Sequence, residues 1–122
     1  MKLAIPLEDN NELDSTISSI FGRAPFFMII DPDSYEFTVE ENPATKAPGG
    51  AGIQAAQWMI DQDVAAVISG NLGPKAHEVL AVGKIAVYKF TGGSIADVVN
   101  AYIQQTLESF FEPNVNAHSG MR

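Results

Sequence analysis

Continuous and alternating runs of apolar residues predict five β-strands in this chain. Val64–Ser69 is almost entirely apolar and rich in β-branched residues, which is typical of a parallel strand covered by helices on both faces. Leu3–Leu7 predicts a first strand, and the apolar run Phe26–Ile30 predicts a strand inside the sheet. Tyr35–Glu40 alternates between apolar and polar residues, as expected of a strand with one exposed face. Lys84–Phe90 is the fifth predicted strand.

Apolar residues spaced three or four positions apart predict three helices. The first spans Ile53–Gln62, and Trp58 falls nearly opposite its predicted buried stripe. The second, Pro74–Val82, begins with proline, which is favoured at the first position of a helix. Ser94 and Asp97 have the spacing of a capping box and predict the start of the third. The predicted buried residues of the first and third helices are Ile53, Ala56 and Ile60, and Ile95, Val98, Val99, Tyr102, Ile103 and Thr106.

The predicted element order is β-β-β-α-β-α-β-α. The turn Asp31–Ser34 should join the second and third strands into an antiparallel hairpin, because proline and aspartate favour tight turns. A helix separates the last two strands, so these should be parallel, and we expect the first strand to lie between them and the hairpin. This predicts an α/β fold with a five-stranded mixed sheet and three helices, an arrangement that resembles the ribonuclease H-like architecture. We expect one domain over residues 1–112 and a polar tail at 113–122.

Composition narrows the classes of partner. The chain of 122 residues has a formal net charge of −8, and its seven Lys and Arg side chains are scattered along it. We therefore expect no nucleic-acid binding, which depends on clustered basic side chains. No window approaches the roughly 18–20 apolar residues of a membrane span, and the N-terminus does not resemble a signal peptide. We expect a cytoplasmic protein that does not contact membranes.

Cysteine is absent, which excludes disulfides, thiol nucleophiles and thiolate ligands for a metal. The two histidines of the chain are His77 and His118. His77 lies on the flank of the second predicted helix, where a solvated or capping role is the ordinary interpretation. His118 lies in the polar tail and either belongs to a flexible segment or contacts a metal or ligand. No cofactor is expected to be required for folding.

A glycine-rich turn precedes the second predicted helix and contains Gly70, Asn71 and Gly73. Backbone N–H groups at a helix start can hold an anion or a polar ligand, and open α/β sheets bind ligands beyond the carboxyl ends of their strands. The alternative is a tight turn that needs glycine for backbone reasons alone. The spacing matches neither a phosphate-binding loop of the Walker type nor a dinucleotide fingerprint, so nucleotide binding is not supported.

Gly49, Gly50 and Gly52 form a second glycine-rich segment, at the start of the first predicted helix. It ends a long irregular stretch with two prolines, and such stretches in compact domains are often functional or mobile. Beside the turn at Gly70–Gly73, it would form a concave surface rich in N–H donors for a small anionic ligand. A flexible hinge is the alternative.

The carboxylates offer no support for metal-dependent nuclease chemistry. Asp9, Asp14, Asp31 and Asp33 all fall in predicted turns, where aspartate is common for local reasons. A two-metal nuclease would need carboxylates inside the central strands.

A series of motifs along the chain resembles one known family. The motifs include Leu3-Ala4-Ile5-Pro6, Phe21-Gly22-Arg23-Ala24-Pro25, Glu41-Asn42-Pro43, Gly49-Gly50-Ala51-Gly52 and Leu72-Gly73-Pro74. In this order and spacing they resemble the dinitrogenase iron–molybdenum cofactor biosynthesis family, which includes the NifX and NafY carriers and the C-terminal part of NifB. The resemblance implies the ribonuclease H-like fold without nuclease activity. It also implies a non-enzymatic carrier for an iron–sulfur or iron–molybdenum cluster or its precursor, with a partner protein in cluster assembly.

The resemblance further implies a site that combines both glycine-rich segments with Gly22 and Arg23. Arg23 would complement the charge of the cluster, backbone N–H groups would bond its sulfides, and His118 would contact a metal. Members of this family often have histidine just before the Phe-Gly motif, where this chain has Ile20. A second hypothesis therefore stands beside the carrier: a small-molecule or protein-binding regulatory module of the same fold that has lost cluster binding. The oligomeric state is left open.

Overall fold

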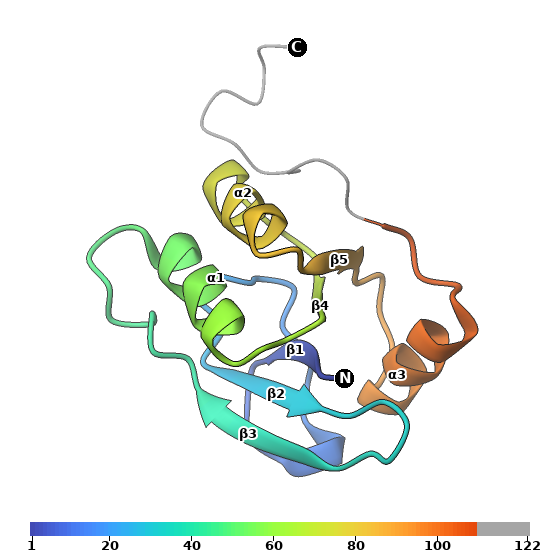
Figure 1. Ribbon diagram of the computed structural model, residues 1–122. Helices are drawn as coiled ribbons and strands as arrows, with labels where there is room; N and C mark the ends of the chain where they lie inside the picture. The colour runs from blue at the N-terminus through green and yellow to red at the C-terminus, as the bar shows by residue number, and fades with distance from the viewer. Residues whose placement is uncertain (110–122) are drawn as a thin grey trace.

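A mixed five-stranded sheet forms the centre of the protein (Figure 1). The computed structural model describes residues 1–109, so residues 110–112 of the predicted domain, the tail at 113–122 and His118 lie outside the described part. The sheet has the order β3-β2-β1-β4-β5. Its strands are β1 (Leu3–Leu7), β2 (Phe26–Ile30), β3 (Phe37–Glu41), β4 (Ala66–Ser69) and β5 (Ala86–Lys89).

The pairing of the strands confirms the predicted topology. β2 is antiparallel to both β1 and β3, whereas β4 is parallel to both β1 and β5. β1 therefore lies between the hairpin and the parallel pair, as predicted. The hairpin turn is held by Asp31, whose carboxylate accepts a hydrogen bond of 2.9 Å from the N–H of Asp33.

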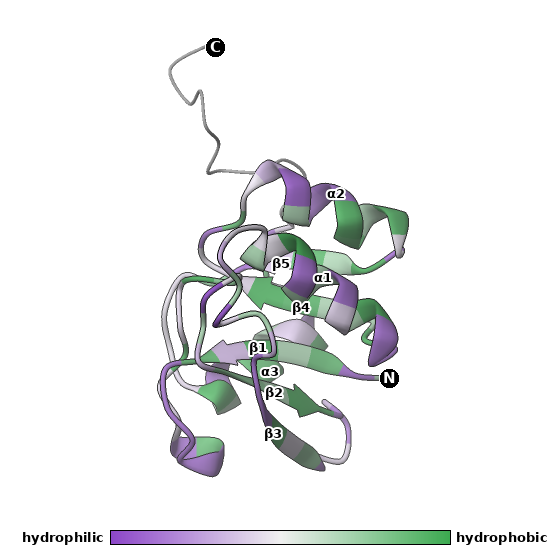
Figure 2. Ribbon diagram, turned by 90° about the vertical axis from the view of Figure 1, so that its left-hand side faces the viewer, coloured by the Kyte–Doolittle hydropathy of each residue, from purple (hydrophilic) through white to green (hydrophobic). Residues whose placement is uncertain are grey.

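Helices cover both faces of the sheet, which gives three layers (Figures 1 and 2). α1 (Ala51–Asp61) and α2 (Pro74–Val82) pack on one face, and α3 (Ile95–Gln104) packs on the other. Successive side chains of a strand point to opposite faces, so Ala4 of β1 contacts the α1 and α2 layer, while its neighbours join the cluster under α3. Burial on both faces explains why β1, β2 and β4 show no polar alternation.

The buried face of α1 differs from the predicted stripe. Ile53 is 38% exposed, and Ile60 is only partly buried. Trp58, predicted on the exposed face, is half-buried and stacks on Phe27 with ring centroids 5.8 Å apart. The buried residues of α1 are Ala51, Ala55, Ala56 and Met59. Small alanine side chains allow α1 to pack closely against α2 and the sheet. The buried face of α1 is therefore centred on alanines, and the positions of the large isoleucines did not predict it.

The other predicted helices are close to those observed. α2 has the predicted bounds and buries Ala76 and Leu80. α3 buries Ile95, Val98 and Val99, but it ends at Gln104, so Thr106 lies beyond the helix. β4 and β5 are shorter than the predicted ranges, and β3 begins two residues later and ends one residue later than predicted.

The capping box of α3 gives a stability prediction. Ser94 Oγ accepts a hydrogen bond of 3.1 Å from the N–H of Asp97, and Asp97 Oδ2 accepts one of 3.1 Å from the N–H of Ser94. Ser94→Ala should lower the free energy of unfolding in urea by about 1 kcal/mol. Asn100→Ala, an exposed change in the same helix, should be neutral or slightly stabilising.

Because the two hydrogen bonds hold the same turn of backbone, Asp97→Ala should cost less in the Ser94→Ala background than in the wild type. Additive losses in this double-mutant cycle would contradict a reciprocal cap.

Candidate functional site

A surface cavity of about 480 Å³ lies where the chain leaves β4 and where α1 and α2 begin. Three segments line it, at residues 20–23, 50–53 and 71–76. The first is the loop before β2, the second is the start of α1, and the third runs from the end of β4 into α2. The cavity therefore lies beyond the carboxyl end of β4, the usual position for a ligand site in an open α/β sheet.

Glycine allows the three segments to meet at backbone distance. A Cβ added to Gly22 would lie 3.0 Å from both the N and Cα atoms of Gly52, so the loop and the start of α1 are in direct backbone contact. A Cβ on Gly52 would in turn lie 3.2 Å from the Cβ of Ala76 in α2. Where these segments touch, they meet through main chain and small side chains.

The turn after β4 is fixed to the first segment by main-chain pairing. The N–H of Asn71 donates a hydrogen bond of 2.7 Å to the carbonyl oxygen of Ser19, and Ile20 forms a parallel bridge with Asn71. A Cβ on Gly70 would lie 2.8 Å from that carbonyl oxygen. Glycine is therefore required at position 70, because the backbone of Ser19 approaches it too closely for a side chain.

Both helices at the cavity begin with a glycine cap. Gly50, the N-cap of α1, has a φ of 70°, in the left-handed region that favours glycine. Gly73 is the N-cap of α2, and Pro74 occupies its first turn. A glycine cap has no side chain to accept hydrogen bonds from the first turn, unlike Ser94 at α3. The positive ends of two helices, with N–H groups that lack intrahelical acceptors, therefore meet at one cavity.

Asn42 holds the loop that carries Arg23, a role that the sequence did not reveal. It is 2% exposed, and its side-chain amide donates to the carbonyl oxygens of Gly22 at 3.0 Å and Ala24 at 2.9 Å. Its side-chain oxygen accepts a hydrogen bond of 2.8 Å from the N–H of Ala44. The Asn-Pro motif was visible in the sequence, but the partners of Asn42 lie about 20 positions earlier.

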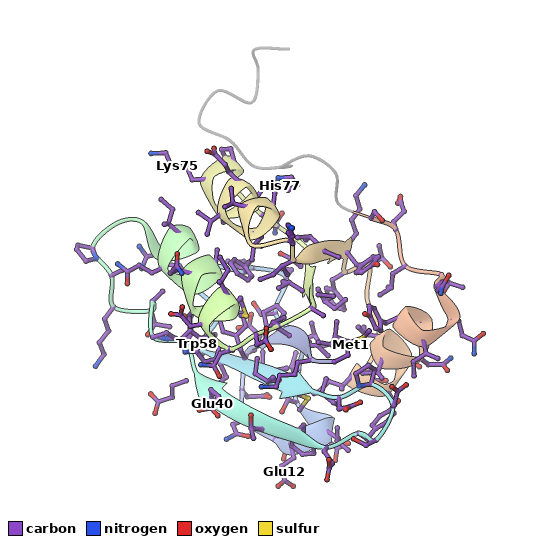
Figure 3. All side chains as sticks on the ribbon, viewed as in Figure 1. Met1, Glu12, Glu40, Trp58, Lys75 and His77 are labelled. Atoms are coloured by element: carbon purple, nitrogen blue, oxygen red, sulfur yellow. The ribbon has the colours of Figure 1, made fainter. Side chains whose placement is uncertain are left out.

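The charges at the cavity are positive. Arg23 and Lys75 line it, and no carboxylate does so among the described residues. The side chain of Arg23 is exposed, and its guanidinium donates a hydrogen bond of 3.3 Å to the carbonyl oxygen of Thr45. This bond restricts the orientation of the side chain. Figure 3 shows Lys75 projecting from α2, whereas Glu12 and Glu40 lie at the other end of the molecule. An acidic protein thus has a cavity suited to an anion.

The structure brings together most of the residues predicted for the site. Gly22, Arg23, Gly50, Gly52, Asn71 and Gly73 line the cavity, whereas Gly49 and Gly70 do not. Gly49 is exposed and has open space around it, and Gly70 acts through backbone packing. Lys75, Ile20 and Ile53 line the cavity although the prediction did not include them.

The described side chains show no direct metal site. Within residues 1–109, no group of three or more His, Asp or Glu side chains is arranged to hold a metal ion. His77 lies on α2 but does not line the cavity. None of the helices in this part of the chain is long and apolar enough to cross a membrane.

The sequence matches a known protein family and a protein from another organism. Residues 1–105 match the family model described as dinitrogenase iron-molybdenum cofactor. A Methanocaldococcus jannaschii protein described as uncharacterized is 35% identical over 113 residues, which cover 90% of this chain and 92% of that protein.

Solved structures share the fold over nearly the whole chain. The apo form of the orange protein from Desulfovibrio gigas superposes with a TM-score of 0.87 and 26% identity, covering 93% of this chain and 96% of that one. A Thermotoga protein provisionally assigned as NifB has a TM-score of 0.74 and 32% identity, covering 88% of this chain and 91% of that one.

Gly49 and Gly70 differ in the space around them, which gives a testable prediction. Gly70→Ala should lower the free energy of unfolding by about 1–3 kcal/mol, because the added methyl group must displace the Ser19 backbone. Gly49→Ala should change it by less than about 0.5 kcal/mol, because a Cβ there meets open space. Urea denaturation of both variants measures the difference, and equal losses would contradict the close approach at Gly70.

Proposed function

Because the chain belongs to the dinitrogenase iron-molybdenum cofactor family, we propose that it is a non-enzymatic carrier of an anionic iron–sulfur or iron–molybdenum cluster or its precursor. The proposed site is the cavity at the starts of α1 and α2. The observation that carries this proposal is the local charge. A chain of net charge −8 has a cavity lined by Arg23 and Lys75, at the positive ends of two helices, with no carboxylate among its described lining residues.

The residues at the cavity favour binding of a cluster by hydrogen bonds and charge attraction over direct bonds to its metal ions. The chain has no cysteine, and the described lining residues include no histidine or carboxylate. A bound cluster would therefore keep its own sulfur ligands. First-turn N–H groups of α1 and α2 would donate to these sulfides, and Arg23 and Lys75 would balance the negative charge. His118, predicted as a metal contact, lies outside the described residues and remains a candidate.

The relatives support this proposal at the level of the family. The description of the orange protein structure as an apo form implies that this relative also has a form with a bound group. The Thermotoga relative carries a provisional assignment as NifB. The β-β-β-α-β-α-β-α order also supports the ribonuclease H-like label. That label, the cytoplasmic location and a partner protein in cluster assembly stay predictions.

One observation favours the second hypothesis, a small-molecule binding module without a cluster. Ile20, at the position where the family often has histidine, is 50% exposed at the cavity, and Ile53 is 38% exposed there. These apolar side chains would suit an anionic ligand with an apolar part. Both hypotheses use the same cationic cavity, so the identity of the ligand distinguishes them.

Anaerobic mixing with a cluster tests the carrier directly. We expect iron to co-elute with the protein in gel filtration after incubation with a soluble thiolate-ligated [4Fe–4S] cluster, or iron and molybdenum after incubation with isolated iron–molybdenum cofactor. Arg23→Gln and Lys75→Gln should each weaken binding about tenfold, because each removes a charge-assisted contact.

Lys84→Gln is the matched control. It removes the same charge just beyond the far end of α2, about 13 Å along the helix from the cavity, and should leave binding unchanged. No metal co-eluting with the wild type would contradict the carrier and favour the second hypothesis. Metal binding that survives the Arg23→Gln, Lys75→Gln double variant would contradict the proposed site.

A further inference from the structure

A second cavity, of about 470 Å³, lies on the α3 side of the sheet, apart from the proposed cluster site. It is formed by the N-terminus, the β2–β3 hairpin, β5 and the C-terminal end of α3. Its lining residues include Met1, Asp33, Tyr88, Tyr102, Ile103 and Gln105. No residue is shared with the first cavity, and no lining residue among those described is Lys or Arg.

Two aromatic rings form one wall of this second cavity. Tyr88 of β5 and Tyr102 of α3 pack edge to face, with ring centroids 5.6 Å apart. The phenol O–H of Tyr102 donates to the sulfur of Met1 at 3.0 Å, which holds the ring against the N-terminus. Both rings are only partly buried and both line the cavity, so part of each ring is accessible to a ligand there.

Two negative groups lie at this cavity, the carboxylate of Asp33 and the C-terminal end of α3. The carboxylate of Asp33 lies near Tyr102, and burial, Tyr88 and Asp33 together raise the pKa of the Tyr102 phenol, which keeps its proton. The C-terminal end of α3 adds the negative pole of the helix, and its last turn contains no basic residue. The carbonyl groups of Ile103 and Gln104 come too late in the helix for an intrahelical donor.

One positive group is also present, because the α-amino group belongs to Met1, which lines the cavity. The amino group of Met1 acts on Asp31, whose pKa is lowered chiefly by hydrogen bonds from the N–H groups of Asp33 and Ser34. The carboxylate of Asp31 therefore stabilises the hairpin turn. Its hydrogen bond with the N–H of Asp33 positions Asp33 at the cavity.

We propose that this second cavity binds a small organic ammonium ion. Two tyrosine rings, a carboxylate and a helix C-terminus together favour a cation that also has apolar surface. A hard metal ion would need several oxygen ligands, and residues 1–109 contain no cluster of three acidic or histidine side chains. The inference does not depend on the cluster-carrier proposal, because it uses different residues on the opposite face of the sheet.

NMR titration of the full chain with choline tests this proposal, with the neutral carbon analogue dimethylbutanol as the matched ligand. We expect choline to shift the ring resonances of Tyr88 and Tyr102 and to bind at least roughly tenfold more tightly than dimethylbutanol, which has the same shape without the charge. No binding of choline, or equal binding of the two ligands, would overturn the proposal.

Two variants locate the ammonium site. Asp33→Asn is an exposed change that keeps the backbone bond to Asp31, and it should weaken choline binding roughly tenfold. Tyr88→Leu should also weaken binding, because it removes a ring while keeping an apolar side chain. Glu78→Gln, the same change of charge on α2 at the opposite face, should bind choline as the wild type does. Unchanged affinity in Asp33→Asn would overturn the assignment.

Discussion

The backbone contact between Gly22 and Gly52 is the constraint on which the candidate cluster site depends. A methyl group at either position would press on a neighbouring segment, at 3.0 Å from Gly52 or 3.2 Å from Ala76. The loop before β2, the start of α1 and the start of α2 can therefore meet only while these positions stay small. Their meeting gives a cavity at which the first-turn N–H groups of two helices and the side chains of Arg23 and Lys75 can donate hydrogen bonds.

The two cavities show how local electrostatics can depart from net charge. The chain carries −8 overall, yet the first cavity combines two cationic side chains with two helix N-termini. The second combines a carboxylate with a helix C-terminus on the opposite face. In each case the helix end and the nearby side chain have the same sign, so their effects add. Net charge therefore describes solubility and long-range attraction better than it describes either site.

The fold was largely predictable because its signals are local in the sequence. Apolar runs located β1, β2 and β4, and Ser94 with Asp97 located the start of α3. The site was less predictable because its contacts join distant segments. Gly49 and Gly50 look alike in the sequence, yet only Gly50 adopts a left-handed conformation and lines the cavity. In the sequence Lys75 resembles any surface lysine of a helix, and only the fold places it at the same cavity as Arg23.

Glycine caps at α1 and α2 suit a ligand that must be released. A serine or aspartate cap would stabilise each helix by only a few tenths of a kcal/mol more than glycine, but its side chain would take up a first-turn N–H group and occupy the cavity. α3, by contrast, begins with a full capping box. A carrier without thiolate ligands would hold its cluster through these N–H groups and two cations. Transfer to a partner would then require no protein–metal bond to break at this cavity, and the partner could complete the exchange by offering stronger ligands.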